Sequence, residues 1–322
     1  MQTAGIEAIS NEADITHLPF TDLYLCLDTG AGLIARFRPD PVRTNKTGHY
    51  AVPPRFFRDI DEIRTIILQN ETEEGTITYK GLRLRYARFT AAENEEWAAV
   101  RAVPLDLPEL DELGMNPKLV MKLRGWGNKK GCIIVGGKTG EGKTTTSIAL
   151  LNDYLRRNGG LLFTCEDPIE FLAQGAISDK GFCLQYEVKE DTDWTPAIKR
   201  AMRTRPDYIF VGEIRTAEAA EQFLQASTSG HLVVTTVHAG SVSDAVNAIV
   251  QMAERKMGRS ARSILADSLI GALFQKLTPD GPIVKCVEKK NDGIDNLAQI
   301  IKSGDISSIE RSSENYPPSR RS

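Results

Sequence analysis

One glycine-rich octapeptide has the residue types and spacing with the clearest chemistry in this sequence. It is Gly137-Lys138-Thr139-Gly140-Glu141-Gly142-Lys143-Thr144, and Thr145 follows it. Glycines at these positions let successive backbone N–H groups point inward and surround phosphate oxygens. Lys143 would reach the β- and γ-phosphates, and the Thr144 hydroxyl would contact Mg²⁺. The octapeptide therefore predicts a P-loop that binds ATP and Mg²⁺ through residues 137–145.

Two groups of carboxylates follow apolar runs and could act on that phosphate. Residues 166–170 are Glu-Asp-Pro-Ile-Glu, and Glu213 follows the run 208–212. P-loop enzymes usually place an Asp in the metal shell just before a Glu that acts on water, but Gly212 stands at that Asp position. Another carboxylate must then contact the metal. We assign Glu166 and Glu213 jointly to acting on the attacking water and to contacting the metal shell, without separating their roles. The predicted metal-shell residues are Thr144, Glu166, Asp167 and Glu213. The alternative for the acidic cluster is a solvated loop.

Histidines and arginines are the remaining candidates. His231 and His238 flank the apolar run 232–237. A histidine at a strand end can hydrogen-bond a γ-phosphate, and the alternative for each is a core histidine with satisfied hydrogen bonds. The arginines that could supply positive charge are Arg83, Arg85, Arg101, Arg203 and Arg215. For the first three the alternative is a solvated strand face. The predicted catalytic set is Lys143, Glu166, Glu213, Arg215 and His238, and the others are predicted to bind the nucleotide.

Strands that alternate with helices must position these side chains. Apolar runs at 132–135, 161–165, 208–211 and 232–237 predict buried strands, and helical patterns separate them. This alternation predicts an α/β fold with a doubly wound parallel sheet, in which ligands bind beyond the carboxyl ends of the strands. The P-loop, Glu166, Glu213 and His238 would meet at that edge. From residue 241 on the pattern is helical, most clearly at 263–277.

The chain divides at a proline-rich segment, 104–108. Before it, short strands and one amphipathic helix at 55–69 predict a small α+β domain. The predicted organisation is a flexible arm (1–19), the α+β domain (20–104), a linker (105–128), the α/β domain with C-terminal helices (129–310) and a disordered tail (311–322).

Composition limits the function classes. The 322 residues are 41% hydrophobic and 26% charged, with a formal net charge of -3, as in an ordinary soluble protein. The acidic balance gives no reason to expect direct nucleic-acid binding. No apolar run is long enough for a transmembrane helix, and the polar N-terminus does not resemble a signal peptide. Five scattered cysteines indicate free thiols in a reducing compartment.

Four motifs together resemble the type II/type IV secretion superfamily of motor ATPases, over roughly residues 80–300. Residues 137–144 resemble its Walker A motif, and 164–171 (Thr-Cys-Glu-Asp-Pro-Ile-Glu-Phe) resemble its Asp box. Residues 203–215 resemble its Walker B region, including the glycine that replaces Asp, and 229–238 its His box. The resemblance implies a RecA-like ATPase domain, a smaller PAS-like N-terminal domain, and a homohexameric ring with ATP between subunits. It also implies that N-domain arginines approach the nucleotide.

The absence of a tetracysteine insert favours the compact branch of the superfamily. That branch contains pilus-retraction (PilT-like) motors and type IV secretion or conjugation motors, and the divergent N-terminal domain favours the latter. The implied partners are inner-membrane platform or coupling proteins, with the ring in the cytoplasm and indirectly attached to the inner face of the bacterial cytoplasmic membrane. Two alternatives remain open: a RecA-like nucleic-acid translocase, and a regulatory ring that binds ATP without useful turnover.

Overall fold

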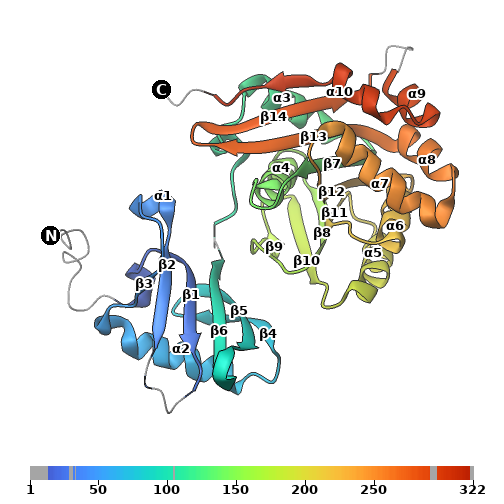
Figure 1. The fold of residues 1–322 in the computed structure, drawn as a ribbon. Helices are drawn as coiled ribbons and strands as arrows, with labels where there is room; N and C mark the ends of the chain where they lie inside the picture. The colour runs from blue at the N-terminus through green and yellow to red at the C-terminus, as the bar shows by residue number, and fades with distance from the viewer. Residues whose placement is uncertain (1–13, 29–31, 33, 104–105, 291–295, 320–322) are drawn as a thin grey trace. The chain divides into compact units, whose positions relative to one another are not determined.

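The computed structural model describes residues 14–28, 32, 34–103, 106–290 and 296–319 (Figure 1). The chain forms two compact units, Met1–Leu105 and Asp106–Ser322, called here the smaller and the larger unit. The division falls inside the proline-rich segment 104–108, where the sequence predicted it. Each unit has its own sheet and its own core.

The smaller unit is a six-stranded antiparallel sheet in the order β3-β2-β1-β6-β5-β4. Its strands are β1 (Phe20–Cys26), β2 (Ala35–Pro39), β3 (Tyr50–Ala51), β4 (Glu74–Tyr79), β5 (Leu82–Thr90) and β6 (Glu96–Val103). Its helices are α1 (Pro41–Thr44) and α2 (Phe57–Gln69). In α2, Ile60, Ile63 and Ile67 recur at helical spacing and are fully buried, packed against alternate strand residues such as Leu23 and Leu84. This face-to-face packing forms the core of the unit.

The larger unit contains a nine-stranded sheet in the order β15-β14-β13-β7-β12-β11-β8-β10-β9. The six strands from β13 to β10 are parallel, and the flanking strands pair antiparallel. The strands are β7 (Gly131–Gly137), β8 (Gly160–Glu166), β9 (Gly175–Ala176), β10 (Gly181–Glu187), β11 (Tyr208–Glu213), β12 (Leu232–His238), β13 (Leu269–Thr278), β14 (Gly281–Glu288) and β15 (Glu314–Tyr316). The helices are α3 (Pro117–Trp126), α4 (Lys143–Asn158), α5 (Trp194–Arg203), α6 (Ala217–Ser227), α7 (Val242–Met257), α8 (Ser260–Ser268), α9 (Asn296–Ser303) and α10 (Ile309–Ser312).

Helices cover both faces of this sheet (Figure 1). On β7, Cys132 and Ile134 point into the core shared with α5 to α8, whereas Ile133 and Val135 point into the core shared with α3 and α4. Successive residues of a strand face opposite sides, so a strand buried on both sides needs an uninterrupted apolar run. This requirement explains the runs from which the parallel strands were predicted.

The helix expected at 263–277 is wrong beyond Ser268. The chain there becomes β13, which pairs with β7 on one side and with β14 on the other. Leu269, Ala272 and Leu273 are buried among both cores, and such a run has no periodicity that distinguishes a strand from a buried helix. The tertiary pairing with β7 decides the conformation.

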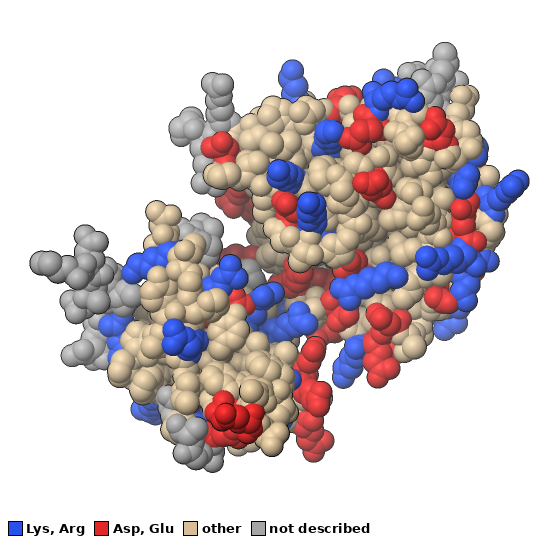
Figure 2. Space-filling model, viewed as in Figure 1, with Lys and Arg blue, Asp and Glu red and all other residues tan. Residues whose placement is uncertain are grey.

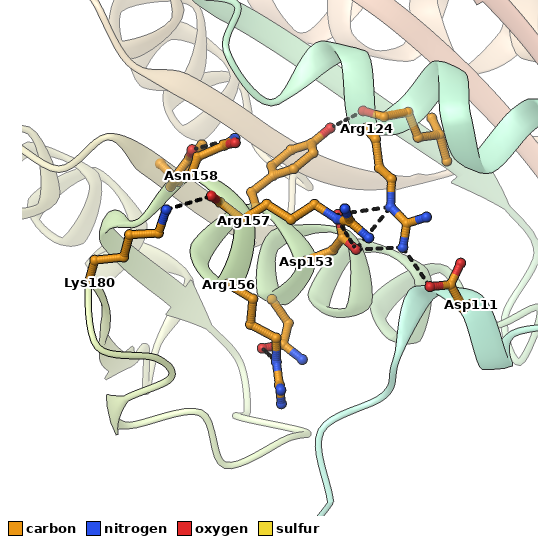
Figure 3. A network of polar contacts seen from close by, with 11 residues as sticks. Asp111, Arg124, Asp153, Arg156, Arg157, Asn158 and Lys180 are labelled. Carbon is orange, nitrogen blue, oxygen red and sulfur yellow. Dashed lines mark hydrogen bonds and ion pairs between the residues drawn. The ribbon is translucent and has the colours of Figure 1, made fainter.

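Residues 106–128, expected as part of a linker, belong to the larger unit. Helix α3 buries Leu119, Leu123 and Trp126 completely. Figure 3 shows the polar network that joins α3 to α4: Arg124 contacts Asp153 through its Nε at 3.0 Å and its Nη2 at 2.7 Å. The same Nη2 reaches Asp111 at 2.6 Å, and Arg156 pairs with Glu109 at 3.0 Å. Residues 109–124 are therefore attached to α4.

The described parts of both predicted termini are packed. Residues 1–13 lie outside the described residues, but Ile15 is fully buried and its N–H donates to Asp59 Oδ2 at 3.0 Å. The disorder expected at 311–322 is wrong as far as 319, because β15 pairs with β14 and Tyr316 is buried. Residues 320–322 lie outside the described part. Polar composition indicated disorder at both ends, yet buried side chains and hydrogen bonds attach the described parts of both.

Asp59 offers a test of the smaller unit, because its carboxylate, 4% exposed, accepts three hydrogen bonds. The donors are Ile15 N at 3.0 Å, Tyr79 Oη at 2.7 Å and Lys80 Nζ at 2.6 Å. Asp59→Ala should lower the free energy of unfolding of this unit by about 2–3 kcal/mol, because buried donors lose their acceptor. Hydrogen exchange of α2 peptides in increasing urea measures the loss.

The matched control is Asp61→Ala on the same helix. The Asp61 side chain is 54% exposed and pairs with Arg64. An exposed pair of this kind contributes less than about 1 kcal/mol. Equal losses from the two substitutions would contradict the anchoring role of Asp59.

Candidate active site

The predicted P-loop is a turn between the end of β7 at Gly137 and the start of α4 at Lys143. Gly140 and Gly142 have φ of 79° and 75°, a region that side chains disfavour. Gly142 is the N-cap of α4 and provides no side-chain cap, so the first turn of the helix keeps its N–H groups for another acceptor. A helix N-terminus with uncapped N–H groups is an anion site, and this geometry fits phosphate oxygens.

Lys143 is buried at this turn. Its Nζ donates to the backbone oxygen of Lys138 at 3.1 Å, so it lies across the loop. Burial lowers its pKa, while the charges of Glu213, Glu170 and Glu141 act in the opposite direction. A phosphate would be a stronger partner than a neutral carbonyl. The ammonium is therefore placed to bind an anion in the loop.

The sequence interpretation missed Gln275 on β13, which forms hydrogen bonds to the P-loop and to the start of α4. Gln275 is 2% exposed, and its Oε1 accepts from Thr146 Oγ1 at 2.7 Å while its Nε2 donates to Glu141 O at 2.5 Å. The Glu141 carboxylate accepts from the N–H of Leu277. A polar residue inside the apolar run 269–277 was the available signal, but its significance depended on β13 being a strand beside β7.

The structure explains why Gly212 stands where an Asp was expected. The pairing of Val211 with Cys165 places Gly212 beside Glu166 on the neighbouring strand β8. A Cβ at position 212 would lie 3.3 Å from Cys165 O, 3.4 Å from Glu166 Cα and 3.7 Å from Glu166 Cγ. An Asp there would crowd a second carboxylate against the first. The carboxylate at this point of the edge comes from β8 instead of β11.

Glu166 is almost completely enclosed, at 2% exposure. Its Oε1 accepts from Thr164 Oγ1 at 2.6 Å and from Gln185 Nε2 at 3.0 Å. Its Oε2 is buried and has no hydrogen-bond partner among the described residues. Burial raises the pKa of Glu166 to about 7, and the Glu170 charge adds to this, although hydrogen bonds from Thr164, from Gln185 and from the backbone of Glu170 lower it. A carboxyl with a pKa near neutrality can take up and release a proton at working pH.

Glu213 is the centre of an ion-pair cluster beside Glu166. Its Oε1 lies 2.9 Å from His238 Nε2, and its Oε2 accepts from Arg215 Nη2 at 2.8 Å. Arg215 also lies 3.7 Å from Asp167 Oδ2, which links the cluster to the acidic loop. His238 is level with Gly137 in the pairing of β12 with β7. The P-loop, Glu166, Glu213 and His238 therefore meet at one edge, as the sequence predicted, and Arg215 lies with them.

Two residues predicted to contact the nucleotide do not lie at the P-loop edge of this chain. His231 precedes β12, so it lies at the opposite end of that seven-residue strand, about 20 Å from the P-loop edge. Its Nδ1 is 2.6 Å from Pro206 O, as expected of a satisfied core histidine. Arg203 ends α5 close to the start of β11, also at the far edge, and is exposed. The order of the motifs does not reveal which end of a strand a residue occupies, so the sequence could not predict these two positions.

Arg83, Arg85 and Arg101 lie on β5 and β6 of the smaller unit. Arg85 and Arg101 are cross-strand neighbours, and Arg101 Nε donates to Asp22 Oδ1 at 2.9 Å. Arg85 lies 3.8 Å from Glu74. Their contact with nucleotide stays a prediction.

The raised pKa of Glu166 predicts pH-dependent stability. The ordinary pKa of 4.5 applies to the unfolded chain and about 7 to the folded chain, so the folded state binds this proton more tightly. The unfolded state therefore holds fewer protons across this window, and stability falls as pH rises from 4.5 through 7. At about 1.4 kcal/mol for each pKa unit, the loss is on the order of 3 kcal/mol.

Glu166→Gln removes this titration. In urea unfolding of ligand-free protein, the variant should match the parent below the window and exceed its stability above it. Glu190→Gln, on an exposed side chain, is the control and should follow the parent at every pH. A stability difference between Glu166→Gln and the parent that is the same at all pH values would contradict the assignment.

Comparison with known proteins identifies the family. The model of the family "Type II/IV secretion system protein" matches residues 66–309. The uncharacterised protein YggR of Escherichia coli K12 is 31% identical over 222 residues, which are 68% of this chain and 66% of that protein. The type IV pilus retraction ATPase PilT of Pseudomonas aeruginosa is 36% identical over 184 residues, 56% of this chain and 51% of that protein. The matches thus span half to two thirds of these relatives.

The fold agrees with this assignment. The crystal structure of the pilus retraction motor PilT with bound ADP superposes with a TM-score of 0.71 at 25% identity, over 91% of this chain and 85% of that one. This likeness confirms the predicted fold class, a P-loop α/β unit with a smaller sheet unit before it. Because the family model matches most of the sequence, including every motif at the P-loop edge, the chain belongs to the type II/IV secretion system protein family.

Proposed function

We propose that this protein hydrolyses ATP as the motor subunit of a type IV secretion, conjugation or type IV pilus machine. One observation carries the proposal: the P-loop, the buried Glu166 and the Glu213 cluster converge at the carboxyl edge of one parallel sheet. Ligands of such sheets bind at that edge. The ADP in the PilT crystal structure and the name of PilT as a retraction ATPase support the same function here.

Each group at the edge has a task in phosphoryl transfer to water. The N–H groups of the P-loop and the Lys143 ammonium hold the phosphates. The Thr144 hydroxyl and the carboxylates of Glu166, Asp167 and Glu213 are oxygen donors of the kind that suits Mg²⁺, which would neutralise phosphate charge. Glu166 Oε2 is buried and has no hydrogen-bond partner among the described residues, and it would accept a proton from a water molecule bound beside it. Glu213 contacts Arg215 through its Oε2 and His238 through its Oε1, so it would also orient these two side chains toward the phosphate.

The assembly is part of the proposal. We infer a homohexamer in which ATP lies between subunits, docked to inner-membrane platform or coupling proteins at the cytoplasmic face. In the part of the chain that the structure describes, no helix is both long and apolar enough to cross a bilayer. ATP would draw the smaller unit closed through Arg83, Arg85 or Arg101, and release of phosphate would free it at the hinge 104–108.

The nucleic-acid translocase is the weaker candidate. A nucleic-acid site needs basic side chains gathered along one surface. Figure 2 shows Lys and Arg interspersed with Asp and Glu over the viewed face of the larger unit. The relatives described above do not favour this function either.

Lys143→Ala is the first test of the proposed function. Loss of the ammonium removes a charge-assisted contact that is strongest in the transition state, so turnover should fall by about 10² or more. Steady-state ATPase assays with Mg²⁺ measure the loss, and circular dichroism checks the fold. Lys199→Ala, at an exposed position on α5, is the control and should retain parental turnover. Parental turnover in Lys143→Ala would refute the P-loop assignment.

Arg101→Ala tests action between subunits. If Arg101 acts on a neighbour's nucleotide, the variant should lose turnover while its ATP affinity stays parental. Mixing it with Lys143→Ala should restore part of the activity, because some interfaces then combine an intact arginine with an intact P-loop. Arg58→Ala, on an 89% exposed side chain of α2, is the control. If Arg83→Ala, Arg85→Ala and Arg101→Ala all keep parental turnover, these arginines form only a solvated strand face and the proposed contact with the nucleotide is wrong.

A further inference from the structure

The side chain of Gln185, near the end of β10, joins the Glu166 carboxyl to the acidic loop that follows it. Its Nε2 donates to Glu166 Oε1 at 3.0 Å and to Phe171 O at 2.9 Å. Its Oε1 accepts from the N–H of Ala173 at 2.6 Å. A single amide group thus holds the beginning and the end of the loop 167–173 together.

These contacts act on one oxygen of the carboxyl. Gln185 and Thr164 both donate to Oε1 of Glu166, while Oε2 is buried without a partner in the described residues. The terminal torsion of a Glu side chain is intrinsically broad, so two donors on the same oxygen select one rotation. Gly212 has no side chain to compete for the space beside it. Of the two oxygens, Oε2 is therefore the one without a hydrogen-bond partner among the described residues.

We propose that Gln185 is a positioning residue for ATP hydrolysis, because it fixes the rotation of the Glu166 carboxyl and thereby presents Oε2 to the attacking water. Gln185 itself does not touch the nucleotide in this scheme. The inference rests on the function proposed above. It assigns a role to a residue outside the four sequence motifs, on a strand that the motifs do not include.

Three single variants separate this role from simple attachment of the loop. Gln185→Leu removes the donor and the acceptor, whereas Gln185→Glu keeps an acceptor for Ala173 but no longer donates to Glu166. Gln174→Ala is the matched control, because Gln174 Oε1 accepts only the backbone N–H of Gln185, at 2.8 Å. The measurements on the full chain are kcat and KM for ATP with Mg²⁺, the exchange rate of the Ala173 amide, and the melting temperature.

Both Gln185 variants should lower kcat by about 10- to 100-fold, the effect of one hydrogen bond to a charged group. KM should stay within about threefold of the parent, because the interaction acts on the reaction and not on binding. Exchange at Ala173 should accelerate in Gln185→Leu and stay near parental in Gln185→Glu. Gln174→Ala should keep parental kcat. If Gln185→Leu does not fold, the kcat and KM of Gln185→Glu provide the test.

A double-mutant cycle shows whether Gln185 acts through Glu166. In the Glu166→Gln background, Gln185→Glu should cause no further loss of kcat, because the carboxylate it positions is gone. Additive losses, or parental kcat in both Gln185 variants of an active enzyme, would overturn this inference and leave the proposed function intact. A parent that does not hydrolyse ATP would overturn both.

Discussion

The burial of one carboxyl group, that of Glu166, is the constraint on which the rest of the site depends. A buried acid needs hydrogen-bond donors and room, and without them its desolvation would exclude it from the fold. Thr164 on β8 and Gln185 on β10 supply the donors, and Gly212 on β11 supplies the room. Because three adjacent strands contribute, the carboxyl is held only after they have paired.

The phosphate-binding loop depends on its neighbouring strand in a similar way. Gln275 on β13 satisfies Thr146 at the start of α4 and the backbone of Glu141 in the loop. Strand β7 therefore lies between β13, which carries Gln275, and β12, which carries His238. Gln275 on β13 and Gln185 on β10 belong to the two outermost strands of the parallel set, and each contacts a loop at the carboxyl edge.

The largest differences between expectation and structure concern segments whose place depends on contacts distant in the sequence. Sequence periodicity distinguishes a helix from a half-exposed strand, but it cannot distinguish two fully buried elements. In the range 269–275 every residue except Phe274 is buried, and the pairing of this segment with β7 determines that it is a strand. Likewise α3 and β15 were assigned to a linker and a tail, although Trp126 and Tyr316 are buried against the larger unit. Those contacts join segments far apart in the sequence.

The sequence by itself determined the P-loop, the α/β alternation and the group of residues at the carboxyl edge, because turn glycines, apolar runs and strand order act locally. Tertiary structure alone decided which donors hold Glu166, that Gly212 lies against Glu166, and that His231 and Arg203 lie at the opposite edge. Those outcomes depend on the register between strands, and register follows from the packing of both sheet faces at once. No single segment contains that information.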